Sequence, residues 1–200
     1  MHFNEDGIFQ VSREEILQLI GCAFTKTLQR DAVLFEMKNQ VQERCLMHRF
    51  AYELRALLKV AEDFQREGRQ VMSLDVEYNR AGEDSKKVEG LKQKWIAVDI
   101  LFHERKSVAK GCRNDIFCCE MKKAEDDEDE DREKVLYTMR QYKYRFGINF
   151  FRFSEQPYSF ELFETSSGGI YSCGIYEYDA ASQNFRHVRE GETVPSEFHR

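Results

Sequence analysis

Two nearly continuous apolar runs decide the fold: WIAVDILFH at 95–103 and DIFCCEMK at 115–122. Each has the length of a strand and is bounded by polar residues, which is typical of strands at the centre of a sheet. Upstream, residues 72–78 (MSLDVEY) alternate apolar and polar side chains, the pattern of a half-buried strand. These three segments predict the middle of a β-sheet.

Apolar residues at three- and four-residue spacings predict helices around this sheet. Ser12, with Glu15 three residues later, forms a capping-box pattern that opens a predicted helix over 12–29. A second helix is predicted over 40–66, with Gly68 to stop it, and a third over 131–146. After Gly147, short strands rich in aromatic residues are predicted at 148–154, 158–164, 171–178 and 184–188. The order αα-βββ-α-ββ, with extra C-terminal strands, predicts an α/β fold with a mixed sheet.

Length and composition favour an ordinary globular protein. The chain has 200 residues, 42% of them hydrophobic, with 16 Phe and 9 Tyr but only two Pro. These apolar side chains are enough for the core of one domain over 1–200, without stabilisation by a metal or disulfides. The apolar runs are far shorter than the ~20 residues of a membrane span, and residues 1–6 do not resemble a secretory signal. We therefore expect a cytoplasmic protein with no membrane partner.

The cysteines are expected to be reduced and mostly buried. They form no C-x-x-C pair and no zinc-ligand spacing, and no local base would activate one of them as a nucleophile. Adjacent Cys118 and Cys119 should point to opposite faces of a strand. The full set is Cys22, Cys45, Cys112, Cys118, Cys119 and Cys173.

The net charge of −6 is concentrated in one place. Residues 125–131 are seven consecutive acids, and outside this run acids and bases are nearly equal in number. Such a run repels itself, so a solvated loop is favoured over a metal-binding role. Basic residues cluster at 86–94 and 105–113, where they could contact phosphates or simply lie in solvated loops.

Both central apolar runs are interrupted by an acid, Asp99 in one and Glu120 in the other. A buried carboxylate is costly unless it is paired, so each interruption needs an explanation. A hairpin loop over 105–114 would place the two acids opposite one another, where like charges destabilise a sheet. A cation is therefore expected beside them.

Two candidates can supply that cation. Strand alternation puts Lys122 on the same face as Glu120, and a divalent ion could bridge both carboxylates. The alternative is a structural ion pair between an acid and a lysine at a sheet end, without metal. The helix predicted over 40–66 favours the metal site, because Glu43 falls in the middle of its apolar stripe, while Glu53 is expected at the periphery and His48 on the surface.

At these residues the sequence resembles the PD-(D/E)xK nuclease superfamily, which has the restriction-endonuclease-like fold. Val98-Asp99 stands where that pattern has Pro-Asp, and Glu120-Met121-Lys122 matches its E-x-K half. The likeness extends over about 40–155 to small standalone bacterial members, through an acid-bearing helix at Glu43 and a later helix that opens at Asp131. The absent proline contributes rigidity rather than a ligand.

The resemblance implies a metal-dependent nuclease that hydrolyses phosphodiester bonds, of DNA rather than RNA. Asp99, Glu120 and the Met121 carbonyl would hold Mg²⁺ or Mn²⁺, and Glu43 would assist through a metal-bound water or a second ion. Lys122 would orient or help deprotonate the attacking water. Further substrate contacts are expected from the following residues, although each could equally be a solvated side chain: Glu77, Asn79, Arg80, His103 and Arg105.

A second class of function stays open on the sequence. The fold could serve as a module that binds nucleic acid without cutting it, or as a protein-interaction subunit. The balanced charge outside the acidic run gives little electrostatic attraction to DNA, which a partner protein or a homodimer could supply. Stabilisation by Mg²⁺ would favour the nuclease over a pure scaffold.

Overall fold

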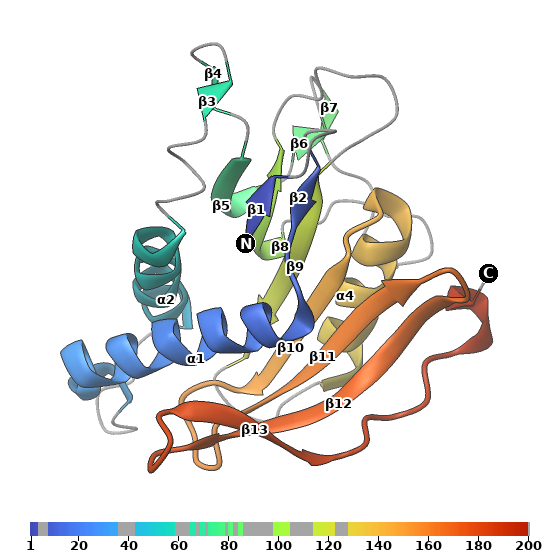
Figure 1. Ribbon diagram of the computed structural model, residues 1–200. Helices are drawn as coiled ribbons and strands as arrows, with labels where there is room; N and C mark the ends of the chain where they lie inside the picture. Colours follow the sequence, from blue (N-terminus) through green and yellow to red (C-terminus); the bar gives the residue numbers. More distant parts are fainter. Residues whose placement is uncertain are drawn as a thin grey trace.

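Seven strands form the central sheet in a computed structural model, which describes residues 1–3, 8–35, 43–58, 65–66, 69–70, 72–78, 80–81, 84–85, 98–104, 114–122 and 128–199. The strands are β5 (Met72–Tyr78), β8 (Val98–Glu104), β9 (Asp115–Met121), β10 (Phe146–Arg152), β11 (Ser159–Ser166), β12 (Gly169–Asp179) and β13 (Asn184–Arg189). Their order across the sheet is β13-β12-β11-β10-β9-β8-β5 (Figure 1). Each lies at a predicted position, and the mixed α/β class is confirmed.

One parallel pair distinguishes this mostly antiparallel sheet. β9 and β10 run parallel, while every other neighbouring pair in the sheet is antiparallel. Helix α4 (Glu128–Tyr142) connects the two parallel strands. Such a crossover needs a helix-length connection, which places α4 directly beside the strand that carries Glu120.

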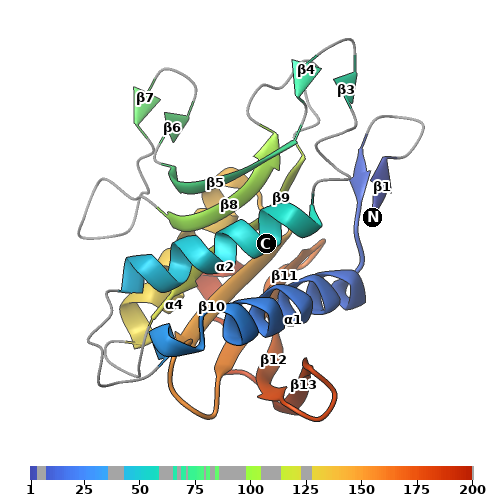
Figure 2. The ribbon, with the colours of Figure 1, turned by 90° about the vertical axis from the view of Figure 1, so that its left-hand side faces the viewer.

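Three helices cover the two faces of the sheet. Helices α1 (Arg13–Arg30) and α2 (Glu43–Leu57) lie in front of it in Figure 2, and α4 lies behind. The predicted start of α1 is confirmed, because Ser12 and Glu15 cap it reciprocally. Within the described residues, no helix has both the length and the apolar character needed to span a membrane.

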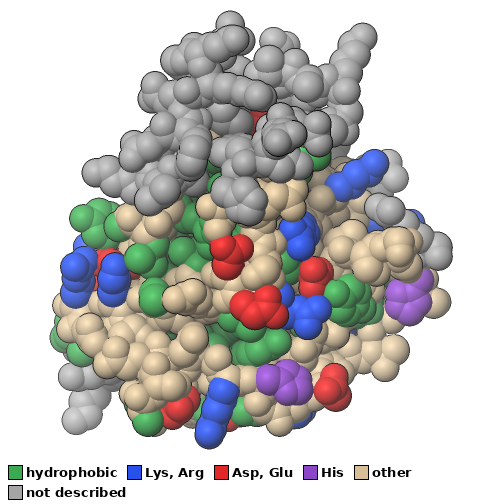
Figure 3. Space-filling model, in the orientation of Figure 1, with side chains coloured by type: hydrophobic (Ala, Val, Ile, Leu, Met, Phe, Trp, Pro, Cys, Tyr) green, Lys and Arg blue, Asp and Glu red, His purple; other side chains and the backbone are tan. Residues whose placement is uncertain are grey.

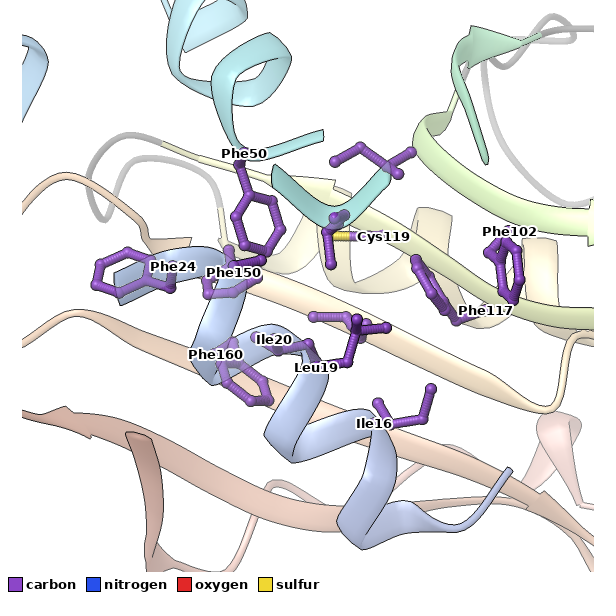
Figure 4. Close-up of a cluster of buried hydrophobic side chains, with 14 of the residues drawn as sticks. Ile16, Leu19, Ile20, Phe24, Phe50, Phe102, Phe117, Cys119, Phe150 and Phe160 are labelled. Atoms are coloured by element: carbon purple, nitrogen blue, oxygen red, sulfur yellow. The ribbon is translucent and has the colours of Figure 1, made fainter. Parts of the chain in front are cut away.

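Aromatic side chains fill the layer between the sheet and helices α1 and α2 (Figure 4). Phe24 of α1 packs against Phe153 and Phe185, with ring centroids 5.3 and 5.2 Å apart. Phe150 of β10 meets Phe50 of α2 at 5.6 Å. Both helices are therefore held to the sheet by buried rings.

A smaller apolar cluster lies under α4 on the opposite face. It includes Val135 and Met139 of α4 together with Cys118, while Cys119 belongs to the first cluster. The prediction that the two cysteines face opposite sides is confirmed. No disulfide links the described cysteines, which are all free.

Close packing of α4 on β10 depends on Gly147. A Cβ at this position would overlap Sδ of Met139 and Cγ1 of Val135. We expect Gly147→Ala to lower the free energy of unfolding by about 1–3 kcal/mol, the usual cost of overpacking. Urea denaturation measures this change, and Gly168→Ala is the control, because a Cβ there comes no closer than 3.8 Å to its nearest neighbour, Ser166 Oγ. Equal midpoints for the two variants would contradict the packing described.

Three predicted helix boundaries are wrong, namely the end of α2 and both ends of α4. Helix α2 ends at Leu57 instead of 66, and Gln65–Arg66 forms strand β3, which pairs with β4 (Arg69–Gln70). Residues 65–66 cannot belong to the predicted helix, because their backbone pairs with residues 69–70. Gly68, the predicted stop, lies outside the described residues.

Helix α4 begins and ends earlier than predicted, at Glu128 and Tyr142 rather than at 131 and 146. The last four acids of the run at 125–131 form its first turn instead of a loop, because acids are stabilised by the dipole at a helix N-terminus. Residues 125–127 lie outside the described part. At the other end Lys143 has a left-handed φ of 59°, which ends the helix before the buried strand residue Phe146.

Short elements not predicted from the sequence complete the described chain. Strand β1 (His2–Phe3) pairs with β2 (Phe9–Gln10), and β6 (Arg80–Ala81) pairs with β7 (Asp84–Ser85). Short 3-10 helices occur at Ala32–Phe35 and Ser196–Phe198.

Candidate functional site

The two interrupting acids occupy paired strands. β8 and β9 pair Ile100 with Cys119 and Leu101 with Cys118, the register that the sequence predicts. Continued by one residue, this register sets Asp99 opposite Glu120. A bulge after Phe102 shifts the pairing at the other end of the ladder, where His103 meets Asp115.

Asp99 is half-buried and held by the backbone of β9. Its Oδ2 accepts a hydrogen bond of 2.8 Å from the Met121 N–H. Burial raises the pKa of Asp99, and the negative charge of Glu43 raises it further, against the opposing effects of the Met121 N–H and Lys134. The carboxylate is therefore placed where its charge is costly.

Glu120 is more deeply buried, with 3% of its surface exposed. Burial, and then the charge of Asp99, raise the pKa of Glu120 well above its usual range. Its Oε2 accepts a hydrogen bond of 2.8 Å from Nζ of Lys134. Its Oε1 is buried without a hydrogen-bond partner among the residues that the structure describes. The raised pKa shows that a negative charge on Glu120 is costly here, so a further cation at this oxygen would stabilise its ionised form.

The lysine that contacts Glu120 is not the predicted one. Lys122 lies just beyond β9, and its Nζ is 3.5 Å from Oδ2 of Asp131, with 36% of its side chain exposed. The expected contact of Lys122 with Glu120 is made instead by Lys134, which projects from α4. Because α4 lies over this face of the sheet, a residue far from E-x-K in sequence takes the position expected for its lysine.

Glu43, from the other helix layer, acts on this group through its charge. It is the first residue of α2 and half-buried. Burial is the main cause of the raised pKa of Asp99, and the negative charge of Glu43 raises it further. Burial lowers the pKa of Lys122, but the charges of Asp131 and Glu43 raise it by more, so that it lies above its usual value. The charge at the start of α2 therefore acts on Asp99 of β8 and on Lys122, just beyond β9.

In this cluster around Asp99 and Glu120, carboxylates outnumber ammonium groups. Each of its members interacts electrostatically with at least one other; they are the carboxylates Glu43, Asp99, Glu120 and Asp131 and the ammonium groups Lys122 and Lys134. If all are ionised the excess charge is negative, and one divalent cation would balance it. Oxygen donors of this type suit Mg²⁺ or Mn²⁺, so the residues fit the ion that the sequence predicts.

The Met121 carbonyl is compatible with its predicted role as a metal ligand. The next residue, Lys122, turns its backbone toward β10, since its N–H donates to Phe150 and its carbonyl accepts from Phe153. Met121 turns its N–H the opposite way, toward Asp99. Because the N–H and C=O of an extended residue point to the same side, the Met121 carbonyl also faces β8.

Sequence reasoning missed Asn149, the partner of Glu120 on β10. It is buried, and its Oδ1 has no hydrogen-bond partner within the described ranges. Gly147, two residues earlier, faces α4, so strand alternation turns Asn149 to that same face. A polar residue inside the apolar stretch 146–153 was the available signal, of the same kind that identified Asp99 and Glu120.

His103 does not belong to the site. It was expected either near the substrate or in water at a strand end, but it is fully buried, with Nε2 3.0 Å from Oδ2 of Asp75. Four residues along a strand separate it from Asp99, a distance of about 13 Å. The polar face predicted for the 72–78 strand is likewise buried at Ser73 and Asp75.

The other expected substrate residues are described only in part. Glu77 is exposed, adopts a left-handed φ of 48° and forms an ion pair of 3.0 Å with Arg44. Arg80 begins β6, and its side chain lies outside the described atoms, as do Asn79 and Arg105 entirely. Of the remaining α2 predictions, His48 is exposed as expected, whereas Glu53 is buried and paired with Arg30 at 2.7 Å, so its predicted peripheral position is wrong.

No three His, Cys, Asp or Glu side chains of the described ranges are already gathered at metal-ligand geometry. Lys134 occupies one oxygen of Glu120, so any ion that binds here has to share or take that position. On the face drawn in Figure 3, acidic and basic side chains of the described residues are interspersed, without a large area of one sign.

Comparisons of the chain with protein-family models, with curated proteins and with solved structures found no match.

Proposed function

We propose that the chain is a metal-dependent nuclease of the PD-(D/E)xK type, with a restriction-endonuclease-like core, that hydrolyses phosphodiester bonds of DNA. One observation carries the proposal. The register of the paired strands sets Asp99 opposite Glu120, both acids have raised pKa values, Lys134 contacts Glu120, and the charge of Glu43 acts on Asp99. Structural ion pairs rarely bring several acids together with an unpartnered buried oxygen, whereas metal-ion catalysis needs this arrangement.

The sheet topology supports the same proposal. The antiparallel strands that carry Asp99 and Glu120 are followed by a helix and then by a parallel strand, β10. This order agrees with the layout that the resemblance implies, and it places the E-x-K segment at the end of a strand, where substrate can approach from the sheet edge.

The residues of the site would have different roles in metal binding and catalysis. Asp99, Glu120 and the Met121 carbonyl would hold Mg²⁺, with Glu43 behind a water or a second ion. A bound Mg²⁺ would polarise the phosphoryl oxygen, lower the pKa of its water and stabilise the leaving oxygen. Lys122, whose side chain is 36% exposed and lies 3.5 Å from Asp131, would reach an approaching phosphate or orient the attacking water.

Cleavage assays test this function directly. We expect the protein to cut plasmid, linear double-stranded or single-stranded DNA in Mg²⁺ or Mn²⁺ and to lose all activity in EDTA, with RNA cut more slowly. Absence of cleavage of every nucleic acid in both metals would overturn the nuclease proposal. Metal binding without cleavage would favour the alternative, a module that binds nucleic acid or a partner protein.

Glu43→Gln is expected to lower cleavage about 10–100-fold, the usual effect of losing a group that supports the ligands of a metal. Because Glu43 acts through its charge on Asp99 and Lys122, most of the loss should be recovered at higher Mg²⁺ concentration. Steady-state assays across a Mg²⁺ titration measure both effects. Glu190→Gln is the control, since the side chain of Glu190 is 89% exposed and lies on the far edge of the sheet. A loss that no Mg²⁺ concentration changes would assign Glu43 a different role.

A further inference from the structure

Lys134 holds the carboxylate that the proposed metal would need. Its Nζ lies 2.8 Å from Oε2 of Glu120, with 27% of the lysine side chain and 3% of the Glu120 side chain exposed. The pair is therefore largely removed from water, and the ammonium is the cation that makes the buried Glu120 charge tolerable.

The backbone that carries Lys134 is fixed. The neighbouring residues Val135 and Leu136 are fully buried, and Met139 is 1% exposed, so α4 cannot withdraw from the sheet at this point without opening the core. The lysine side chain itself is a flexible stem with several rotatable bonds. A change at Glu120 can therefore move the ammonium group while the helix stays in place.

An alternative position for the ammonium is available nearby. Asp131 lies three residues earlier on the same helix, and its charge acts on Lys134. Asn149 is the strand partner of Glu120, and its buried Oδ1 has no hydrogen-bond partner among the described residues. Both groups accept hydrogen bonds, and neither requires Lys134 to leave the site.

We propose that Lys134 is the built-in counter-ion of this site: it neutralises Glu120 until a divalent cation replaces it, and then turns toward Asp131 and Asn149. The inference rests on the proposed metal-dependent function and describes its regulation. Metal loading becomes an exchange of one cation for another on Glu120. The protein thus stays folded without metal, and its affinity for the ion is set by the strength of the lysine contact.

Substitutions at position 134 test the exchange through metal affinity rather than through activity. Lys134→Met keeps the apolar stem and removes the charge, so Mn²⁺ should bind about tenfold more tightly than to the wild type. Lys134→Arg should bind Mn²⁺ several-fold more weakly, because a guanidinium can hold Glu120 through two hydrogen bonds. Lys122→Met is the matched control and should change the affinity less than either. Calorimetric titration of the full chain with Mn²⁺ at fixed pH gives all four constants.

The outcomes separate this inference from the proposed function. Unchanged or weaker Mn²⁺ binding by Lys134→Met, or undiminished binding by Lys134→Arg, overturns the exchange. If Lys134→Met does not fold, the arginine variant decides alone. If the affinities change as expected but the wild type cleaves nothing, the exchange stands and the nuclease proposal fails. No Mn²⁺ binding by any folded variant overturns both.

Discussion

Asp99→Asn is expected to lower metal-dependent cleavage about 1000-fold without lowering stability. A bound metal contributes several kcal/mol of transition-state stabilisation, and each 1.36 kcal/mol corresponds to a factor of ten. The asparagine can still accept the Met121 N–H, so the backbone contact of 2.8 Å is retained. Burial raises the pKa of Asp99, which means that folding disfavours its charged form. In the absence of metal at pH 7, a neutral residue of the same size should therefore unfold at an equal or higher temperature.

Loss of cleavage together with undiminished stability distinguishes a metal site from an ion pair that serves only the fold. If Asp99 served only in an ion pair at a sheet end, its neutralisation would lower the melting temperature and leave any cleavage unchanged. Cleavage rates and thermal unfolding in EDTA, measured on the same preparation, separate the two cases. The Glu190→Gln protein provides the reference for both measurements.

Phe150→Ala is expected to lower the free energy of unfolding by about 3–5 kcal/mol, the range for truncating a buried phenylalanine. The Phe150 ring is fully buried and meets Phe50 at 5.6 Å, Phe160 at 4.9 Å and Phe185 at 5.9 Å. One ring therefore links α2, β10, β11 and β13, and its loss opens a cavity that none of these elements can fill alone. Since domains of this kind are stable by about 5–15 kcal/mol, the variant should be close to unfolding.

Tyr52→Ala is the control for this truncation. Tyr52 lies on the outer face of α2 and is 59% exposed, with Arg49 over its ring. Its removal should cost less than about 1 kcal/mol. Urea denaturation followed by circular dichroism measures both variants, and similar losses would contradict the assignment of Phe150 to the centre of the core.

The sheet was predictable because its signals are local. Alternation in 72–78, the apolar runs around Asp99 and Glu120, and the aromatic strands after Gly147 each identify a strand from its own residues. The Ser12 and Glu15 cap fixed the start of α1 in the same way. The pairing register followed from one loop length, because the chain between the two central strands is short.

Residue pairs that are brought together only by tertiary packing could not be predicted from local sequence. Lys134 lies 14 residues after Glu120, and the packing of α4 on β9 and β10 brings the two together. His103 and Asp75 pair across neighbouring strands and are buried, although Asp75 alternates with apolar residues as exposed side chains do. The helical periodicity predicted through residue 66 is replaced at Gln65–Arg66 by pairing with the next strand.

Anomalous diffraction from crystals soaked in Mn²⁺ shows whether Asp99 and Glu120 share a divalent cation. We expect a manganese peak about 2.1 Å from an oxygen of each carboxylate. We also expect Nζ of Lys134 to leave Glu120 in the same crystal. Manganese bound elsewhere, with Lys134 still on Glu120 and no peak between the two acids, would contradict the shared site.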